Sequence, residues 1–150
     1  MTAPEGRPGG EGGCVLCDTD GGLLLHRAAC WRLIRATDMP GFPALYRVVW
    51  NAHVAELSDL SEVERRECMD VVATVERVMR LHLPQAKINL AALGNVVPHL
   101  HWHLIARFGW DSRFPAPVWA PAQREADAAR LADLALRLPA LDAALRAALQ

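Results

Sequence analysis

Residues 99–107, HLHWHLIAR, constrain the fold more than any other segment of the chain. His99, His101 and His103 alternate there with three large apolar residues, and an alternation of period two is typical of a β-strand with one buried face. We therefore predict a strand that runs from His99 to Arg107, with the three imidazoles on one side and the apolar side chains packed on the core.

Three imidazoles in a row suit a ligand that extends along the strand. Side chains at i and i+2 stand about 6.6–6.8 Å apart at ~3.3–3.4 Å per residue, a spacing that matches groups contacting a phosphate chain. Crowding disfavours charging all three rings, so a neutral imidazole is available as a nucleophile near pH 7. The residues alone leave three interpretations open: exposed histidines on an amphipathic strand, ligands of a metal such as zinc, or covalent catalysis by histidine at phosphorus.

The central part of the chain predicts an α+β domain with an antiparallel sheet. A long helix is expected from Ser61 to Leu83, because Ser61 and Glu64 form a capping box, apolar residues recur every three or four positions, and Pro84 ends the pattern. The other strand candidates are the β-type runs at 31–37, 45–50 and 87–93.

The two ends of the chain differ from this central part. Residues 1–13 are rich in Gly and Pro and are predicted to be a flexible tail. Residues 108–121 hold three prolines and two tryptophans and are expected to be irregular. From Gln123 onward an Ala, Leu and Arg-rich segment is predicted to be helical, with an interruption at Pro139. The expected organisation is a tail at 1–13, a globular domain at 14–120 and a C-terminal helical extension at 121–150.

Charge and composition exclude several classes of protein. Sixteen Lys and Arg balance 17 Asp and Glu, for a net charge of −1 with no basic block, which argues against a nucleic acid polymer as partner. No apolar run approaches the ~18 residues that cross a bilayer, and residues 1–13 hold no signal-peptide pattern. We expect a cytoplasmic protein without a membrane partner. In that setting, Cys14 and Cys17 are interpreted as a metal-binding or redox pair rather than a disulfide.

The histidine strand resembles the signature of the histidine-triad (HIT) family. The run from His99 to Ile105 matches the family pattern of three histidines interleaved with apolar residues at all seven positions, and the order of elements agrees from residue 14 to about 119. The runs HVAELSDLSEVER and GNVVPHLHWH are similar to a bacterial branch. The resemblance implies a HIT-like fold, in which an antiparallel sheet of about five strands packs with one long helix, and it implies a homodimer.

The resemblance also implies a nucleotidyl hydrolase or transferase. His101 would attack the α-phosphorus of a nucleotide and form a nucleotidyl-histidine that water resolves, while His99 and His103 would orient it and contact phosphate oxygens or the leaving group. The implied substrate is a dinucleoside polyphosphate such as diadenosine tetraphosphate, or a nucleoside phosphoramidate, and this chemistry requires no cofactor. Two alternatives stay open: a zinc-stabilised nucleotide-binding module with little catalysis, and a metal-dependent hydrolase that uses the three histidines as ligands.

Six further residues are expected by this resemblance to contact the nucleotide. The chain departs from the family pattern at two places: the turn GNVV lacks the hydroxyl that many members place near phosphate, and Leu45 stands where many members have a histidine. The expected contacts are Leu33 and Ile34 at the base, Asp38 at the ribose hydroxyls, Asn89 as a polar contact or a structural amide, and Gly94 and Asn95 at phosphate.

A second group of residues has the composition of a zinc site. Cys14, Cys17, His53 and His99 supply two thiolates and two imidazoles, which is a tetrahedral zinc set. Some relatives of the family use a comparable arrangement. If zinc binds, we expect it to be structural, because protein atoms fill all four positions; it would pin the N-terminal segment to the histidine strand. The alternative is a reduced cysteine pair in a turn with a solvent-facing His53.

Overall fold

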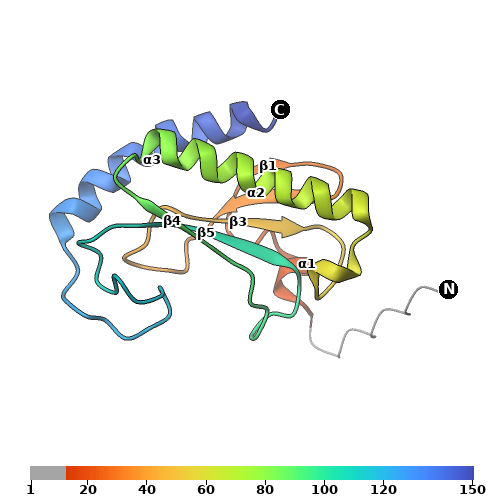
Figure 1. The fold of residues 1–150 in the computed structure, drawn as a ribbon, viewed down its shortest axis with the longest axis horizontal. Helices are drawn as coiled ribbons and strands as arrows, with labels where there is room; N and C mark the ends of the chain where they lie inside the picture. Colours follow the sequence, from red (N-terminus) through yellow and green to blue (C-terminus); the bar gives the residue numbers. More distant parts are fainter. Residues whose placement is uncertain (1–12) are drawn as a thin grey trace.

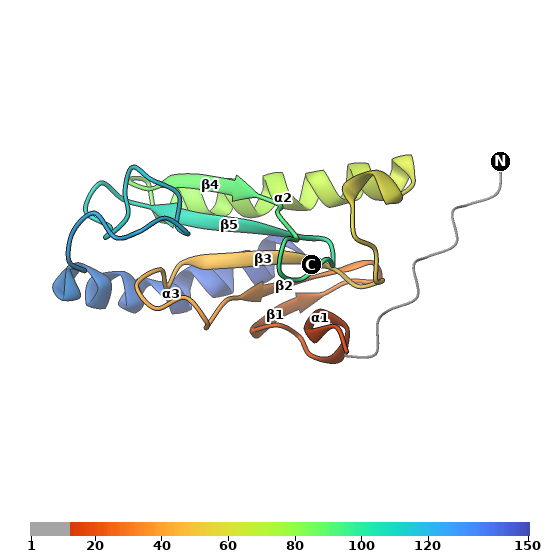
Figure 2. The same ribbon diagram turned by 90° about the horizontal axis from the view of Figure 1, so that it is seen from below.

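The computed structural model describes residues 13–150, so the predicted tail at 1–13 lies outside the described residues apart from Gly13. Five strands form one antiparallel sheet in the order β1-β2-β3-β5-β4, with helices packed on it (Figures 1 and 2). This arrangement confirms the predicted α+β class. The strands are β1 (Leu23–Arg27), β2 (Trp31–Arg35), β3 (Leu45–Trp50), β4 (Lys87–Ala91) and β5 (His101–Arg107).

The observed strands differ from the predicted ones at two places. Strand β1 was missed, because LLLHR is a short run after a glycine pair and has no clear alternation of apolar and polar residues. Strand β5 begins at His101 rather than His99, because the His99 N–H donates to the Val97 carbonyl at 2.8 Å and so closes a tight turn before the strand. The other three strands lie where the sequence placed them.

The predicted long helix is confirmed as α2 (Glu62–His82). The Ser61 side chain accepts from the Glu64 N–H, and the Glu64 carboxylate accepts from the Ser61 N–H, which satisfies two backbone donors at the helix start. The face of α2 toward the sheet is apolar and buried, with Cys68 among its residues; this face belongs to the main core. Its burial provides the largest part of the helix's stability.

The C-terminal segment forms one helix, α3 (Ala128–Ala148), and the predicted interruption at Pro139 does not occur. Proline removes one intrahelical hydrogen bond, but buried leucines lie on both sides of it and hold the two halves on one core. Asp142 adds a polar anchor, because its carboxylate accepts from Tyr46 Oη at 2.8 Å and from Arg35 Nε at 3.1 Å. The buried leucines are Leu134, Leu138, Leu141 and Leu145.

The two faces of the sheet are covered differently. Helices α2 and α3 lie together over one face, and Figure 1 shows both on the same side of the strands. The other face is covered only in part, by the short helix α1 (Val15–Asp18), through Leu16 against Ile34 and Val49, and by loop residues such as Val118. Figure 2 shows this second face, with α1 beside β1 and β2. No helix within residues 13–150 is long and apolar enough to cross a membrane.

Candidate active site

Two of the three histidines form a pair on the partly covered face of the sheet. His101 and His103 alternate with core residues along β5, so both rings emerge on the side opposite α2 and α3. Their ring centroids lie 4.9 Å apart at an interplanar angle of 70°. The ring of His99 lies elsewhere, in the cysteine cluster described below, because His99 precedes the strand.

The hydrogen bonds of His101 determine which ring nitrogen is free. Its Nδ1 lies 2.5 Å from the carbonyl oxygen of His99. Because a carbonyl can only accept, Nδ1 carries the proton and Nε2 keeps its lone pair. Burial lowers the pKa of His101, and the positive charge of Arg47 lowers it further, which favours the neutral ring. His101 therefore has the protonation state and the free nitrogen that a nucleophile needs.

His103 is more deeply buried and contacts an arginine that the sequence analysis did not single out. Arg47 Nε donates to His103 Nδ1 at 3.4 Å, and the indole of Trp119 packs edge-on against the same ring at 5.1 Å between centroids. Burial, followed by the charges of His101 and Arg47, lowers the pKa of His103 to about 4. The ring is thus neutral near pH 7, with its proton on Nε2.

Strand register explains why Arg47 lies at this site. Arg47 in β3 pairs with His103 in β5 and with Ile34 in β2, so the three side chains share the partly covered face. Arg47 is the only charged residue in the strand LYRVVW, and that was the signal available in the sequence. The pairing of Arg47 with His103, 56 positions away, depends on the register between β3 and β5, and this register cannot be predicted from the sequence alone.

The residues expected at the nucleotide fall into two groups. Ile34 lies on the same face as the histidine pair but is fully buried against Leu16, and the Asp38 carboxylate pairs with Arg47 at 3.1 Å with 64% of its side chain exposed. Leu33 points to the opposite face, where it is fully buried in the core, so the structure does not bring it to the histidines. Adjacent strand residues point to opposite faces, and Leu33 and Ile34 cannot line one pocket from within β2.

The remaining expected contacts lie toward β4. Asn89 accepts a hydrogen bond from Arg107 at 3.1 Å, which fixes its side-chain oxygen. Gly94 and Asn95 lie in the connection between β4 and β5, and Gly94 has φ +72°, in the left-handed region that favours glycine. A turn of this shape leads the chain to His99 and the start of β5.

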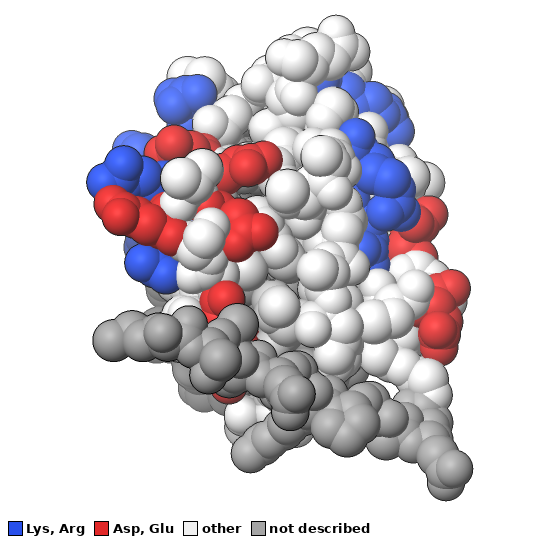
Figure 3. All heavy atoms as spheres, turned by 90° about the vertical axis from the view of Figure 1, so that its right-hand side faces the viewer, with Lys and Arg blue, Asp and Glu red and all other residues white. Residues whose placement is uncertain are grey.

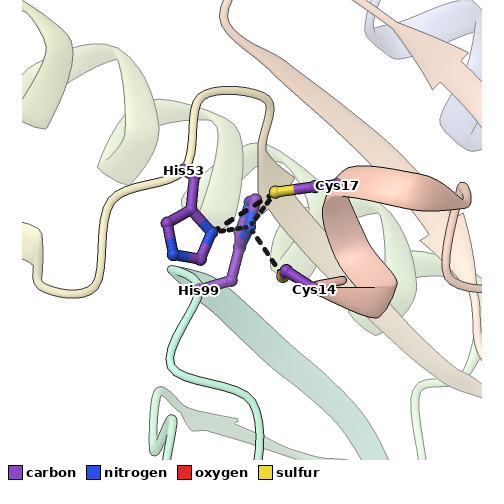
Figure 4. A group of neighbouring side chains, drawn as sticks. All are labelled: Cys14, Cys17, His53 and His99. Carbon is purple, nitrogen blue, oxygen red and sulfur yellow. Dashed lines mark hydrogen bonds between the residues drawn. The ribbon is translucent and has the colours of Figure 1, made fainter. Parts of the chain in front are cut away.

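The four residues of the predicted zinc set come together beside this face (Figure 4). The Nδ1 of His99 lies 3.4 Å from Cys14 Sγ, 3.5 Å from Cys17 Sγ and 3.2 Å from His53 Nδ1. One ligand atom from each residue lies within 4.8 Å of every other. His99 Nε2 lies 2.6 Å from the Trp50 carbonyl, so Nε2 carries the proton and the Nδ1 lone pair faces the cluster.

These distances fit a tetrahedral ion. Zinc bonds of about 2.3 Å to sulfur and 2.0–2.1 Å to nitrogen require donor atoms roughly 3.3–3.8 Å apart. Four of the six donor separations are 3.2–3.5 Å, close to that range, and all six are within 4.8 Å. Burial and the neighbouring Cys14 thiol raise the pKa of Cys17, an unfavourable crowding of thiols that a bound cation would reverse. The carbonyl held by His99 Nε2 is the outer-shell partner that a metal-bound imidazole commonly has.

A buried arginine holds the cysteine pair in position. Arg32 in β2 is 3% exposed, and its guanidinium donates to the backbone carbonyls of Leu16, Thr19 and Asp20. These bonds satisfy carbonyls in and just after the single turn of α1 that carries the two cysteines. The short helix is therefore fixed to the sheet by side-chain hydrogen bonds as well as by burial of Leu16.

Fold and site together define a class of protein: an α+β domain whose antiparallel sheet carries a pair of neutral imidazoles on its partly open face. Residues 31–109, more than half of the chain, match the family described as HIT domain. The chain belongs to the HIT family. Cys14 and Cys17 lie outside the matched residues, so the cysteine pair of the cluster is not part of that match.

Solved structures with the same fold include two bacterial histidine triad proteins. One, from Bradyrhizobium japonicum, is 28% identical and has a TM-score of 0.68, with 87% of this chain and 92% of that chain covered. Another, from Marinobacter aquaeolei VT8, is 24% identical and has a TM-score of 0.64, with coverage of 84% and 92%. The predicted HIT-like fold is confirmed by these similarities.

A curated relative carries the name of an enzyme. The AP-4-A phosphorylase of Mycobacterium tuberculosis is 33% identical over 81 residues, which are 50% of this chain and 42% of that protein. The chain thus matches less than half the length of this curated relative.

Proposed function

We propose that this protein is a nucleotidyl hydrolase or transferase in which His101 is the nucleophile. The observation that carries the proposal is the geometry of His101: its Nδ1 is held by the His99 carbonyl, which leaves the Nε2 lone pair free on the partly open face. His103 lies beside it as a neutral donor, and His99 positions it through that carbonyl. The histidine pair requires no cofactor for this chemistry.

The reaction proceeds in two displacements at one phosphorus atom. His101 Nε2 forms a bond to the α-phosphorus while the bond to the leaving-group oxygen or nitrogen breaks, and the leaving group departs with the electron pair and takes up a proton from solvent water. Water then adds to phosphorus, the P–N bond breaks with its electron pair returning to the imidazole, and the products are a nucleoside monophosphate and a proton. His103 Nε2–H stabilises charge on the phosphate oxygens in both steps.

The proposed substrate is a dinucleoside polyphosphate such as diadenosine tetraphosphate, or a nucleoside phosphoramidate. The name AP-4-A phosphorylase, carried by a relative 33% identical over half of the chain, supports the first of these. In this assignment Asp38 contacts the ribose and the turn at Gly94 and Asn95 the phosphate, whereas Ile34, fully buried against Leu16, has no surface left for a base. Asn89, in β4 opposite Ile105, is proposed as a further polar contact.

Steady-state kinetics of a nucleophile variant test this function. His101→Ala is expected to lower turnover of diadenosine tetraphosphate by at least ~1,000-fold, because the covalent path is lost, while AMP binding changes little. His82→Ala, at the exposed end of α2, is the matched control and should keep full activity. Wild-type turnover in His101→Ala would refute the proposed nucleophile. Nucleotide binding without turnover by the wild-type protein would favour the binding-module alternative.

We also propose a structural zinc at Cys14, Cys17, His53 and His99. All four positions of a tetrahedral ion are filled by protein atoms in this arrangement, so the ion would have no open position for substrate. Bound zinc would supply cross-linking of α1 to the start of β5. The arrangement argues against the alternative hydrolase, because His101 and His103 are not in the group of possible metal ligands found within residues 13–150.

We further propose that the partners are a nucleotide and a second copy of the chain. Strand β4 is an edge of the sheet, with Leu90 39% exposed and Leu93 52% exposed next to a hollow of about 610 Å³. An open apolar edge of this kind is a template for strand pairing.

On the face drawn in Figure 3, basic and acidic side chains lie in adjoining groups of both signs, which does not favour a nucleic acid polymer as a partner. A cytoplasmic location stays a prediction.

A further inference from the structure

Arg47 is a charged side chain on the floor of the candidate active site, with 13% of the side chain exposed. Its three guanidinium nitrogens have different roles. Nε donates to His103 Nδ1 at 3.4 Å, and Nη2 donates to both oxygens of Asp38 at 3.1 and 3.2 Å. Within residues 13–150, no protein atom accepts a hydrogen bond from Nη1, and Nη1 is not enclosed away from solvent.

The ion pair with Asp38 does not by itself explain why a largely buried arginine occupies position 47. Asp38 is 64% exposed, and exposed pairs stabilise a protein by only about 0–1 kcal/mol. The neighbours of Arg47 across β2 and β5 are Ile34 and His103, so an apolar residue at position 47 would avoid the cost of desolvating a guanidinium. An arginine at this place is therefore explained best by an anion that it binds.

The position of Arg47 identifies which anion that is. Arg47 lies directly across from His103, whose ring is next to that of His101, so it is one strand over from the nucleophile and two residues along. A phosphorus atom attacked by His101 would lie over the histidine pair, and Arg47 would reach the neighbouring group of the same ligand. Two contacts already fix the guanidinium, so little side-chain freedom is lost when Nη1 engages a ligand.

We propose that Arg47 binds a second phosphate of the substrate, adjacent to the phosphate that His101 attacks. This inference rests on the proposed function and narrows its substrate to nucleotides that carry two or more phosphates. Nη1 donates to the second phosphate while Nη2 stays with Asp38 and Nε holds His103 with its proton on Nε2. Arginine suits this role because its planar donors match the oxygens of phosphate.

The second phosphate has two possible sources in such a ligand. It is either part of the leaving group, as in a polyphosphate chain, or an ester on the ribose of the attacked nucleotide. Equilibrium binding separates them: ADP carries the first kind, adenosine 3′,5′-bisphosphate carries the second, and AMP carries neither. Binding of these three probes to the full chain by calorimetry does not depend on turnover.

Arg47→Met keeps the length of the side chain and removes the charge. We expect it to weaken binding of ADP or of the bisphosphate by about 10- to 100-fold, the range for a hydrogen bond to a charged group, and to change AMP binding less than ~3-fold. Arg47→Lys, which keeps the positive charge but not the planar guanidinium donors, should lose less affinity for ADP or the bisphosphate than Arg47→Met does. Arg27→Met, which breaks an exposed pair with Asp20 away from the site, is the matched control and should bind all three as wild type does.

Kinetics supply a second readout with the same variants. In Arg47→Met, kcat/KM for diadenosine tetraphosphate should fall about 10- to 100-fold, whereas adenosine 5′-phosphoramidate, which has one phosphate and a neutral leaving group, should change less than ~3-fold. Equal losses on all ligands, or no loss on any, would overturn the proposal. Failure of the proposed function can be distinguished from failure of this inference. It would appear as wild-type turnover in His101→Ala, and the calorimetric comparison of ADP, the bisphosphate and AMP would still test the role of Arg47.

Discussion

At the residue scale, His99 and His101 hold opposite tautomers because each has one backbone carbonyl as neighbour. The Trp50 carbonyl accepts a hydrogen bond from His99 Nε2–H, so the Nδ1 lone pair of His99 faces the thiols. The His99 carbonyl accepts a hydrogen bond from His101 Nδ1–H, so the Nε2 lone pair of His101 faces the open side of the sheet. His99 thus contributes its ring to the cluster and its carbonyl to the nucleophile. A bound zinc would hold both groups in place.

Stability against acid is a residue-scale test of this protonation scheme. The pKa of His103 is lowered to about 4 in the folded state, chiefly by burial, from about 6.5 in an unfolded chain. The stability that it contributes is present above pH ~6.5 and is lost as the pH falls toward 4, by up to about 3 kcal/mol. Chemical denaturation of the wild type across this range should show the loss.

The variant His103→Gln cannot take up a proton and should lose less stability over the same pH range. His82→Gln, which changes an exposed histidine at the end of α2, should follow the wild-type curve. Equal acid sensitivity of His103→Gln and the wild type would show that His103 does not titrate below its ordinary range.

The sequence predicted single residues well where a local pattern carried the signal. The set Cys14, Cys17, His53 and His99 was predicted from its ligand chemistry and from a comparable arrangement in relatives of the family, and the structure brings its four members together. Arg47 was missed because its role depends on the register of two strands far apart in the chain. Leu33 was expected at the base, yet the alternation of side chains along a strand already assigns it to the opposite face from Ile34.

At the element scale, the single turn α1 is attached to the sheet in two ways, through backbone carbonyls and through the thiols of Cys14 and Cys17. The described structure joins it to β2 through Arg32 and to the start of β5 through His99. A helix of four residues has almost no intrinsic stability, so these attachments determine whether it forms.

The metal content of the purified protein tests the proposed cross-link. We expect about one zinc per chain in the wild type, and loss of most of it in Cys14→Ser and Cys17→Ser, measured by elemental mass spectrometry. Zinc at 1,000 times its dissociation constant would stabilise the fold by about 4 kcal/mol, which should appear as a lower melting temperature after chelation. Cys30→Ser, outside the cluster, is the matched control. A wild-type protein without metal that is insensitive to chelators would contradict the site.

Elements with a long periodic pattern were predicted well, and elements fixed by tertiary contacts were not. The capping box and the apolar period of α2 gave its bounds to within a residue. The continuity of α3 through Pro139 depends on Leu134 and Leu141 packing in the same core, which no local pattern encodes. Strand β1 likewise depends on its pairing with β2.

At the scale of the whole molecule, the two faces of the sheet have separate tasks. The face under α2 and α3 carries the main core and supplies stability, while the partly covered face carries the histidine pair, Arg47 and the metal cluster. This division follows from the alternation of side chains along β3 and β5.

We predict that two copies of the chain assemble through their β4 edges. If β4 edges of two copies pair, sedimentation equilibrium should give twice the chain mass of 16.5 kDa. Leu90→Lys places a charge at the exposed edge and should give a monomer, whereas Leu136→Lys, on α3 and 80% exposed, should leave the dimer intact. A wild-type monomer at micromolar concentration would contradict the proposed pairing, as would a dimer that Leu90→Lys does not weaken.

Intact-protein mass spectrometry after rapid mixing with diadenosine tetraphosphate tests the central claim most directly. If His101 Nε2 attacks the α-phosphorus, the wild-type chain gains the mass of one adenylyl group within the time of a turnover, and the adduct is absent in His101→Ala. Turnover by the wild type without any adduct, or an adduct of the same size in His101→Ala, would contradict this account.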